Sequence, residues 1–416
     1  MTMIVFEHAD VLDAAAGALL RDRFVRIEGS KITAVSDRPV NTTGASVIDA
    51  RGKVLMPGLI DCHVHVLASM LNAGRLAKMP NVLAVLRAVP ILQGMLMRGF
   101  TTVRDAAGAD WSLAEAVRTG LVEGPRIFPS GRALSQTGGH GDFRERNDVI
   151  EPCPCTPKIG AMGRVVDGVD AVRRAVREEI QMGATQIKIM ASGGVASPTD
   201  PIHYLGFSED EIRAAVEEAS NADTYVLAHA YTAKAITRAV RCGVRTIEHG
   251  NLVDAEAARV MAEHGAIAVP TLVTYEALAS EGAALGLPPE SVAKIENVRG
   301  AALRSLEIFA AAGVRMAFGT DLLGESHRLQ SDEFTLRAGV LGAAETLRAA
   351  TIHAAHVLRM DGRLGVIAPG ATADLLLVDG NPLQDISVLT GQGEHLALIV
   401  QNGKVVKDAA APHTAT

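Results

Sequence analysis

The chain has 416 residues, of which 48% are hydrophobic and 21% are charged, as is usual for a globular protein with a substantial core. Its formal net charge of −7 argues against nucleic acid and anionic membrane surfaces as partners. No segment reaches the ~18 uninterrupted apolar residues of a membrane helix, and the N-terminal residues lack the pattern of a signal peptide. Four cysteines are too few for a disulfide framework. These features predict a soluble protein of a reducing compartment, the cytoplasm.

Short strand patterns open and close the chain, with Gly and Pro turns between them. They fall at Ile4–Phe6, Phe24–Glu28, Lys31–Ser36, Val47–Asp49, Gly365–Ile367, Asp374–Val378 and Leu396–Val400. Neither end of the chain is large enough to bury a core alone. We therefore expect residues 1–57 and 360–416 to pack together as one small composite β-sandwich domain.

Residues 58–359 alternate short apolar runs with longer helical patterns, such as Asp167–Met182 and Ser208–Asn221. At the start of the second helix, Ser208 and Glu211 are spaced as a capping box. Eight apolar runs have the character of buried parallel strands. They end near His63–His65, Val103–Asp105, Ile127–Ser130, Ile187–Met190, Val226–His229, Thr246–His249, Ala268–Thr271 and Met316–Asp321. This α/β rhythm predicts a (β/α)₈ TIM barrel, which takes ~250 residues, although a doubly wound sheet has a similar rhythm.

Residues that bind metals stand where these apolar strands end. His63 and His65 are two residues apart on a strand, so both rings share one face and can reach a single ion. Lys188 lies between apolar residues of a predicted interior strand, where burial disfavours its charged form. It either pairs with a carboxylate or, as a neutral amine, takes up carbon dioxide to become a carbamate.

Three further candidates end later strands. His229 and His249 close two successive strands, and Asp321 closes the last. Alone, each histidine has a structural interpretation as a buried side chain, and Asp321 has one as a helix cap. Because the strands of a barrel converge at their carboxyl ends, all six side chains are expected to meet on one face.

In the order His-x-His, Lys, His, His, Asp, the sequence resembles the amidohydrolase superfamily, whose binuclear members use this order on strands one, four, five, six and eight. The segments Val54–Asp61 and Pro369–Leu375 resemble the places where the small β domain of that family enters and leaves the barrel. The resemblance covers essentially the whole chain. It implies a ligand set in which His63, His65 and Asp321 hold one divalent ion, His229 and His249 hold the other, and carboxylated Lys188 bridges both.

The resemblance also implies the chemistry of the site. Imidazole and carboxylate ligands suit zinc, with manganese and iron as alternatives. A metal-bridging hydroxide would attack the scissile carbonyl, since metal binding lowers the pKa of water from 15.7 towards ~7. Asp321 would take the proton of the nucleophile and give it to the leaving nitrogen. A homo-oligomer is expected from the family.

Three segments favour one branch of this superfamily. Thr137–Asp142 contains His140 in a glycine-rich loop, Met190–Val195 follows the bridging lysine, and Tyr231 lies two residues after His229. They resemble the imidazolonepropionase-related branch that contains Xaa-Pro dipeptidases (prolidases). There, His140 and Tyr231 would contact the carbonyl oxygen or the terminal carboxylate of the substrate. A structural turn and a packing role are the alternatives.

The predicted function is hydrolysis of amide bonds in Xaa-Pro dipeptides or N-acyl amino acids. A cyclic-amide hydrolase of imidazolone or lactam type is the alternative, and a non-catalytic metal-binding barrel is the alternative from another class. Arg104, Arg132 and Arg144 are candidates for the substrate carboxylate, and sequence does not place them. Cys153 and Cys155 are interpreted as part of a rigid loop, since two ligands alone make no structural zinc site.

Overall fold

The computed structural model describes residues 2–144, 158–195, 200–284 and 289–409, with the backbone alone for 289–293. The predicted Cys153–Cys155 loop lies outside these residues. The chain forms two compact units. The first comprises Met1–Asp61, Gly94–Thr102 and Phe334–Thr416, and the second comprises Cys62–Gln93 and Val103–Glu333. None of the described helices is long and apolar enough to cross a membrane.

The first unit contains an eight-stranded mixed sheet drawn from both ends of the chain. Its strands are β1 (Met3–Asp13), β2 (Ala18–Glu28), β3 (Lys31–Ser36), β4 (Ser46–Asp49), β5 (Val54–Pro57), β15 (Leu375–Val378), β16 (Leu396–Gln401) and β17 (Lys404–Asp408). The order is β17-β16-β15-β5-β1-β2-β3, and β4 pairs with β1. The two chain ends join where β5 runs antiparallel to β15, with Leu55 opposite Leu377. This confirms the predicted composite β-sandwich.

Two differences from the predicted strands have local causes. Gly365–Ile367 is not a strand, because Gly365 has a left-handed backbone (φ +71°) and a Cβ there would lie 2.5 Å from the Thr351 carbonyl oxygen. β1 continues well past Phe6, through a register shift at His8, whose φ is +58°. A bulge of this kind breaks the two-residue alternation, so the sequence pattern shows only the first part of the strand.

The strands of the barrel region run from β6 to β14. They are β6 (Leu59–Val64), β7 (Phe100–Asp105), β8 (Arg126–Phe128), β9 (Ala133–Ser135), β10 (Gly163–Val165), β11 (Ile187–Met190), β12 (Val226–Thr232), β13 (Thr246–Leu252) and β14 (Ile267–Val269). One sheet has the order β6-β7-β8, and another has the order β10-β9-β11-β12-β13-β14 with every pair parallel. The predicted α/β fold class is confirmed.

The eighth predicted strand, Met316–Asp321, lacks regular strand geometry but occupies the eighth position of the barrel. On one side, the Ala317 amide donates to the Ala268 carbonyl next to it (2.9 Å). On the other side, the Cys62 amide donates to the Phe318 carbonyl (2.7 Å). The segment therefore bridges β14 and β6 through its backbone, and joins the two sheets on this side of the barrel.

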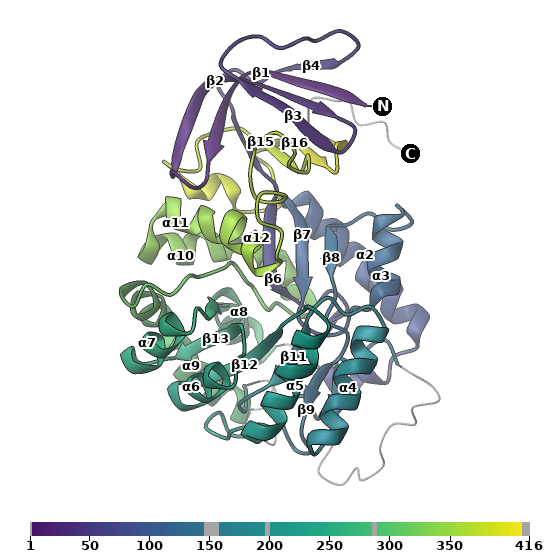
Figure 1. Cartoon of the computed structure of the whole chain (residues 1–416), viewed down its shortest axis with the longest axis vertical. Helices are drawn as coiled ribbons and strands as arrows, with labels where there is room; N and C mark the ends of the chain where they lie inside the picture. The colour runs from purple at the N-terminus through teal and green to yellow at the C-terminus, as the bar shows by residue number, and fades with distance from the viewer. Residues whose placement is uncertain (1, 145–157, 196–199, 285–288, 410–416) are drawn as a thin grey trace. The chain divides into compact units, whose positions relative to one another are not determined.

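Helices follow most of the strands. They are α1 (Ala73–Ala77), α2 (Asn81–Met97), α3 (Trp111–Arg118), α4 (Val169–Gln181), α5 (Glu209–Asn221), α6 (Ala233–Arg241), α7 (Ala255–Glu263), α8 (Val273–Glu281), α9 (Pro289–Ala311), α10 (Glu333–Leu341), α11 (Ala343–Arg348) and α12 (Ala354–Val357). Figure 1 shows α4 to α7 on the outside of strands β11, β12 and β13. Both helices predicted in detail, α4 and α5, are present.

The predicted capping box of α5 is present and gives a test of local stability. The Ser208 hydroxyl accepts from the Glu211 amide (3.3 Å), and the Glu211 carboxylate accepts from the Ser208 amide (2.7 Å). Replacing Ser208 with alanine leaves an amide of the first turn without its acceptor. We expect Ser208→Ala to lower the free energy of unfolding by ~1 kcal/mol, measured by urea denaturation. Ser208→Thr keeps the acceptor and is the control, and equal stability of the alanine variant would contradict the assignment.

Candidate active site

Five histidine rings form a continuous row at the carboxyl ends of the barrel strands. The ring centroids are 5.3 Å apart for His65 and His63, 4.9 Å for His63 and His249, 4.7 Å for His249 and His229, and 4.3 Å for His229 and His140. The four histidines predicted as ligands are at most 9% exposed. The structure thus brings together side chains from β6, β12 and β13 and from the loop after β9.

Asp321 lies at the His65 and His63 end of this row. Its Oδ1 is 3.1 Å from Nε2 of His65 and 3.4 Å from Nε2 of His63, and its Oδ2 is 3.9 Å from Nδ1 of His249. Burial opposes the charge of Asp321, but the surrounding histidines hold its pKa well below the usual range. His63, His249 and Asp321 each place one possible ligand atom within 4.8 Å of those of the other two. Three ligand atoms this close together can bind a single cation.

The hydrogen bonds of the histidines fit the binding of divalent ions. In each of the four rings, one nitrogen is engaged by a fixed oxygen. The pairs are His63 Nδ1 with Glu248 Oε2 (2.7 Å), His65 Nδ1 with the Ala107 carbonyl (3.0 Å), His229 Nε2 with the Gly193 carbonyl (3.2 Å) and His249 Nδ1 with Thr271 Oγ1 (2.8 Å). A nitrogen that donates to oxygen carries the proton, so the other nitrogen of the neutral ring keeps a lone pair for a metal. Burial also lowers the pKa of His229 and His249 well below the usual value.

Lys188 points to the same face of the sheet as His229. On β11, Lys188 is level with Leu227 of β12, and His229 lies two residues further along that strand. Side chains two apart on a strand share a face. Lys188 is 2% exposed, and burial lowers the pKa of its amine to about 8, although the charges of Glu248 and Asp321 act in the opposite direction.

Two of the predicted ligands have an unusual backbone. Glu248 is level with His229, so strand alternation would direct the next residue, His249, to the opposite face. His249 instead has φ +72° and Asp321 has φ +54°, a left-handed conformation that costs a non-glycine residue ~1–3 kcal/mol. This departure from the extended backbone is what allows Glu248 and His249 to lie on the same side of β13.

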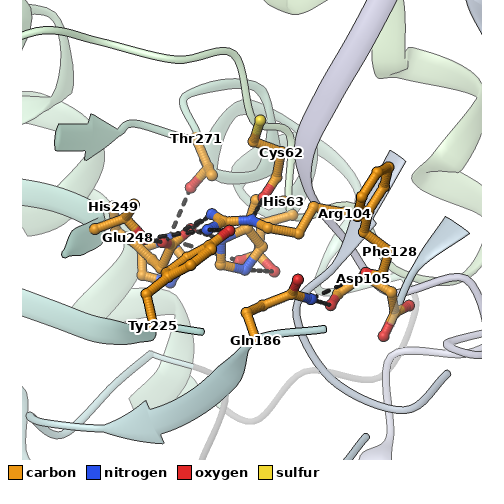
Figure 2. A network of polar contacts seen from close by, with 12 residues as sticks. Cys62, His63, Arg104, Asp105, Phe128, Gln186, Tyr225, Glu248, His249 and Thr271 are labelled. Carbon is orange, nitrogen blue, oxygen red and sulfur yellow. Dashed lines mark hydrogen bonds and ion pairs between the residues drawn. The ribbon is translucent and has the colours of Figure 1, made fainter. Parts of the chain in front are cut away.

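A buried ion pair between Arg104 and Glu248 lies next to the His63 ring (Figure 2). Arg104 and Glu248 are both 0% exposed, and Nη2 of Arg104 donates to both carboxylate oxygens at 2.8–2.9 Å. Thr246 also donates to this carboxylate, and Nε of Arg104 donates to the Cys62 carbonyl (2.6 Å). Burial opposes the charge of Glu248, but Arg104 and His63 outweigh it and lower the pKa of Glu248. The anionic carboxylate therefore fixes the proton of His63 on Nδ1.

Sequence reasoning did not identify Glu248. The available signal is an acidic residue inside the apolar strand Thr246–Leu252, directly before a predicted ligand. Alternation assigns these two neighbours to opposite faces, so only the backbone conformation of His249 reveals that both serve the same site.

Replacing Glu248 with glutamine is expected to weaken metal binding by ~10–100-fold, as is typical when a group that orients a metal-ligating histidine is altered. The amide can still accept from His63, but it lacks the negative charge that strengthens the ring as a ligand. Chelator competition measures the change. Glu179→Gln is a matched control, because Glu179 is also a buried carboxylate (1% exposed) and pairs with Arg164 at 3.1 Å. Equal affinities of the Glu248 variant and the wild type would contradict this role.

His140, predicted as a substrate contact, lies at the end of the histidine row. Its ring stacks on His229 at an interplanar angle of 18°, and its Nδ1 is 3.2 Å from Oδ2 of buried Asp200. A Cβ at Gly194 would lie 2.1 Å from Cε1 of His140. Gly194 is therefore needed so that the backbone here can approach the His140 ring closely.

Tyr231, the other predicted substrate contact, packs against two of the histidines. Its ring lies edge-on to His229 (centroids 4.9 Å apart, 88°) and stacks on His249 (5.3 Å, 24°). Its hydroxyl is 2.7 Å from that of Tyr275 on α8. Burial raises the pKa of both tyrosines, so both are hydroxyls at neutral pH. Tyr275 was not predicted from the sequence, because only the fold brings it next to Tyr231.

The three arginines considered for the substrate carboxylate all lie beside carboxylates of the chain. Arg104 pairs with Glu248, Nη2 of Arg132 is 3.3 Å from Oε1 of Glu179, and Arg144 donates twice to Asp142 (2.7 and 2.8 Å). The structure therefore places all three arginines in ion pairs with carboxylates of the chain itself.

Histidines, a lysine and an aspartate meet at the strand ends of a parallel barrel, and the chain also forms a composite β-sandwich. This combination defines the amidohydrolase class of metal-dependent enzymes. The Amidohydrolase family matches residues 54–406, and the chain belongs to this family. A crystal structure of a prolidase complexed with N-methylphosphonate-L-proline is 63% identical, with a TM-score of 0.96 over 98% of this chain and 100% of that one.

Two more distant relatives have the same architecture. The structure of a Xaa-Pro dipeptidase with methionine bound in its active site is 29% identical, with a TM-score of 0.87 over 98% of this chain and 100% of that one. Ochratoxinase from Aspergillus niger is 32% identical over 410 residues, which span 94% of this chain and 83% of the fungal protein.

Proposed function

We propose that this chain is a metal-dependent Xaa-Pro dipeptidase. The observation that carries the proposal is its 63% identity, over 98% of its length, to a prolidase whose crystal structure holds N-methylphosphonate-L-proline. In that compound a tetrahedral phosphorus is bonded to the proline nitrogen. It thus has the geometry that an acyl-proline amide adopts when water adds to its carbonyl carbon, and compounds of this kind bind well to sites that are complementary to a transition state.

The assignment of the ligands to two ions rests on the resemblance to the binuclear members of the amidohydrolase family. His63, His65 and Asp321 would hold one ion and His229 and His249 the other, with a carbamate on Lys188 between them. The imidazole and carboxylate donors suit zinc. When bound, the ions supply two effects, a lower pKa of water, towards ~7, and polarisation of the substrate carbonyl.

The side chains of the chain move the proton and hold the substrate. As the water oxygen bonds to the carbonyl carbon, Asp321 accepts a proton from it. Asp321 then gives this proton to the proline nitrogen, which leaves as a secondary amine when the C–N bond breaks. His140, held beside Asp200, and Tyr231 contact the carbonyl oxygen or the carboxylate of the substrate.

A substrate panel tests this proposal. Xaa-Pro dipeptides are compared with the reversed Pro-Xaa dipeptides, N-acetyl amino acids, and lactams and hydantoins, with chelator-treated protein as the control. We expect the highest kcat/KM on Xaa-Pro dipeptides and a loss of rate when the proline carboxylate is blocked as an amide. Fastest turnover of a cyclic amide would replace the proposal with the cyclic-amide alternative. Absence of any hydrolysis by the metal-loaded protein would favour a non-catalytic barrel.

A further inference from the structure

A cavity of about 410 Å³ lies between α9 and the segment that joins β13 to α7. α9 packs against both β13 and α7 (Figure 1). The volume falls within the ~300–1,000 Å³ that is usual for small-molecule sites. Among the described residues that line the cavity there is no predicted metal ligand and no predicted substrate contact. The cavity is therefore separate from the candidate active site, although its Asn251 follows the predicted ligand His249 by only two residues.

Most of the cavity wall is apolar, with one cation beside it. The apolar residues of the wall are Leu252, Val253, Ala255, Ala301 and Ile308. Arg304 of α9 also lines the cavity, is exposed, and forms no ion pair with any residue that the structure describes. The carboxylate of Asp254 at this cavity caps α7, where it accepts from the Ala257 amide (2.8 Å). The guanidinium of Arg304 is thus free to pair with a carboxylate of a ligand.

Two buried side chains of the lining offer hydrogen-bond acceptors. Asn251 is 4% exposed, and its Oδ1 has no hydrogen-bond partner among the described residues. Ser305 is 1% exposed, and its hydroxyl donates to the Ala302 carbonyl (2.7 Å), so its oxygen can still accept. Buried polar groups normally have a partner. An unpartnered acceptor in a cavity therefore favours a ligand that brings N–H donors.

We propose that this cavity binds an α-amino acid with an apolar side chain. The carboxylate of the ligand pairs with Arg304, its ammonium group donates to Asn251 and Ser305, and its side chain is covered by the apolar wall. A carboxylic acid without the amine leaves Asn251 unpartnered, and an amino acid without a hydrocarbon side chain leaves the wall exposed to water. Binding here does not depend on the proposed hydrolysis, because no predicted metal ligand takes part in it.

Titration calorimetry of the full-length, metal-loaded protein with L-leucine tests the proposal. The active site is first saturated with N-methylphosphonate-L-proline, so that leucine cannot occupy it. We expect one equivalent of leucine to bind. Arg304→Gln should weaken this binding by about 10–100-fold, as is typical for the loss of one charge-assisted contact. Arg241→Gln is the matched control, because Arg241 is an exposed arginine at the end of α6 that does not line the cavity.

A second variant tests the cavity without changing any charge. Ala301→Leu places a larger side chain on the wall and should lower the affinity for leucine by at least about 10-fold, because the added atoms occupy the space of the ligand. The thermal unfolding midpoint of each variant shows whether it is folded. Both substitutions lie on α9, so two independent changes address the same site.

Analogues of leucine identify the groups that the site recognises. We expect 4-methylpentanoate, which lacks the amine, L-leucinamide, which lacks the carboxylate, and glycine, which lacks the side chain, each to bind at least about 10-fold more weakly. Equal affinities for 4-methylpentanoate and leucine would overturn the assignment to an amino acid.

Two further results would overturn the site itself. The first is a wild-type protein that does not bind leucine, and the second is an affinity for leucine that is the same in the wild type, Arg304→Gln and Ala301→Leu. A wild type that does not bind the phosphonate would count against the proposed function instead. In that case the loss of leucine binding in the two α9 variants still locates the amino acid in this cavity.

Discussion

Replacing Asp321 with asparagine is expected to lower kcat by ~10²–10⁴-fold, the usual contribution of a general acid or base, while most of the bound metal remains. Asparagine keeps an oxygen near His63 and His65, where Oδ1 of Asp321 now lies at 3.4 and 3.1 Å. Its amide cannot accept a proton from water or pass one to the leaving nitrogen. The chemical step therefore loses its proton carrier while the substrate still binds.

The measurement combines steady-state kinetics on the best dipeptide with elemental analysis of the same samples. Asp254→Asn is a matched control, because Asp254 caps α7 by accepting from the Ala257 amide (2.8 Å) and asparagine is an equally good cap. A near-normal kcat in Asp321→Asn would refute the role in proton transfer. Complete loss of metal from that variant would reduce Asp321 to a ligand alone.

Replacing Lys188 with alanine is expected to have a comparable effect by another route. The proposed carbamate forms when the neutral amine attacks carbon dioxide, which makes an N–C bond and releases a proton. Alanine removes the bridge between the two ions, so we expect less than two equivalents of metal. We also expect metal affinity to fall by more than the ~10–100-fold that is typical when a residue hydrogen-bonded to a metal ligand is replaced.

Chemical rescue distinguishes a carbamate from a plain amine. A short carboxylate such as acetate or propionate can enter the space left by the lysine side chain and supply two oxygens to the ions, so it should restore part of the metal content and of the rate. Lys234→Ala, at an exposed lysine of α6, is the control. Two equivalents of metal and wild-type turnover in Lys188→Ala, with no effect of carboxylates, would contradict the bridging role.

Much of this site was predictable because its chemistry lies at strand ends. A polar residue that ends a buried apolar run, such as His229 or Asp321, stands out from its neighbours, and barrel geometry brings such residues together. The capping box at Ser208 was predictable for a similar reason, since its two partners are only three residues apart. The closing segment Met316–Asp321 was located correctly, although it lacks regular strand geometry.

The groups that support the ligands were not predictable, because their role depends on contacts between distant elements. Glu248 and His249 share a side of the sheet only through the left-handed backbone of His249, which no alternation rule anticipates. Tyr275 reaches Tyr231 from a helix 44 residues further along the chain. Arg104 was considered as a contact for the substrate carboxylate because it is a basic residue near the predicted metal ligands. In the structure it pairs with Glu248 instead.

The amount of metal bound to the purified wild-type protein tests whether the site holds two ions bridged by Lys188. We expect two equivalents of divalent metal, with hydrolysis of Xaa-Pro dipeptides by the same sample and loss of both on chelation. A protein that is fully active with one equivalent or less would contradict it.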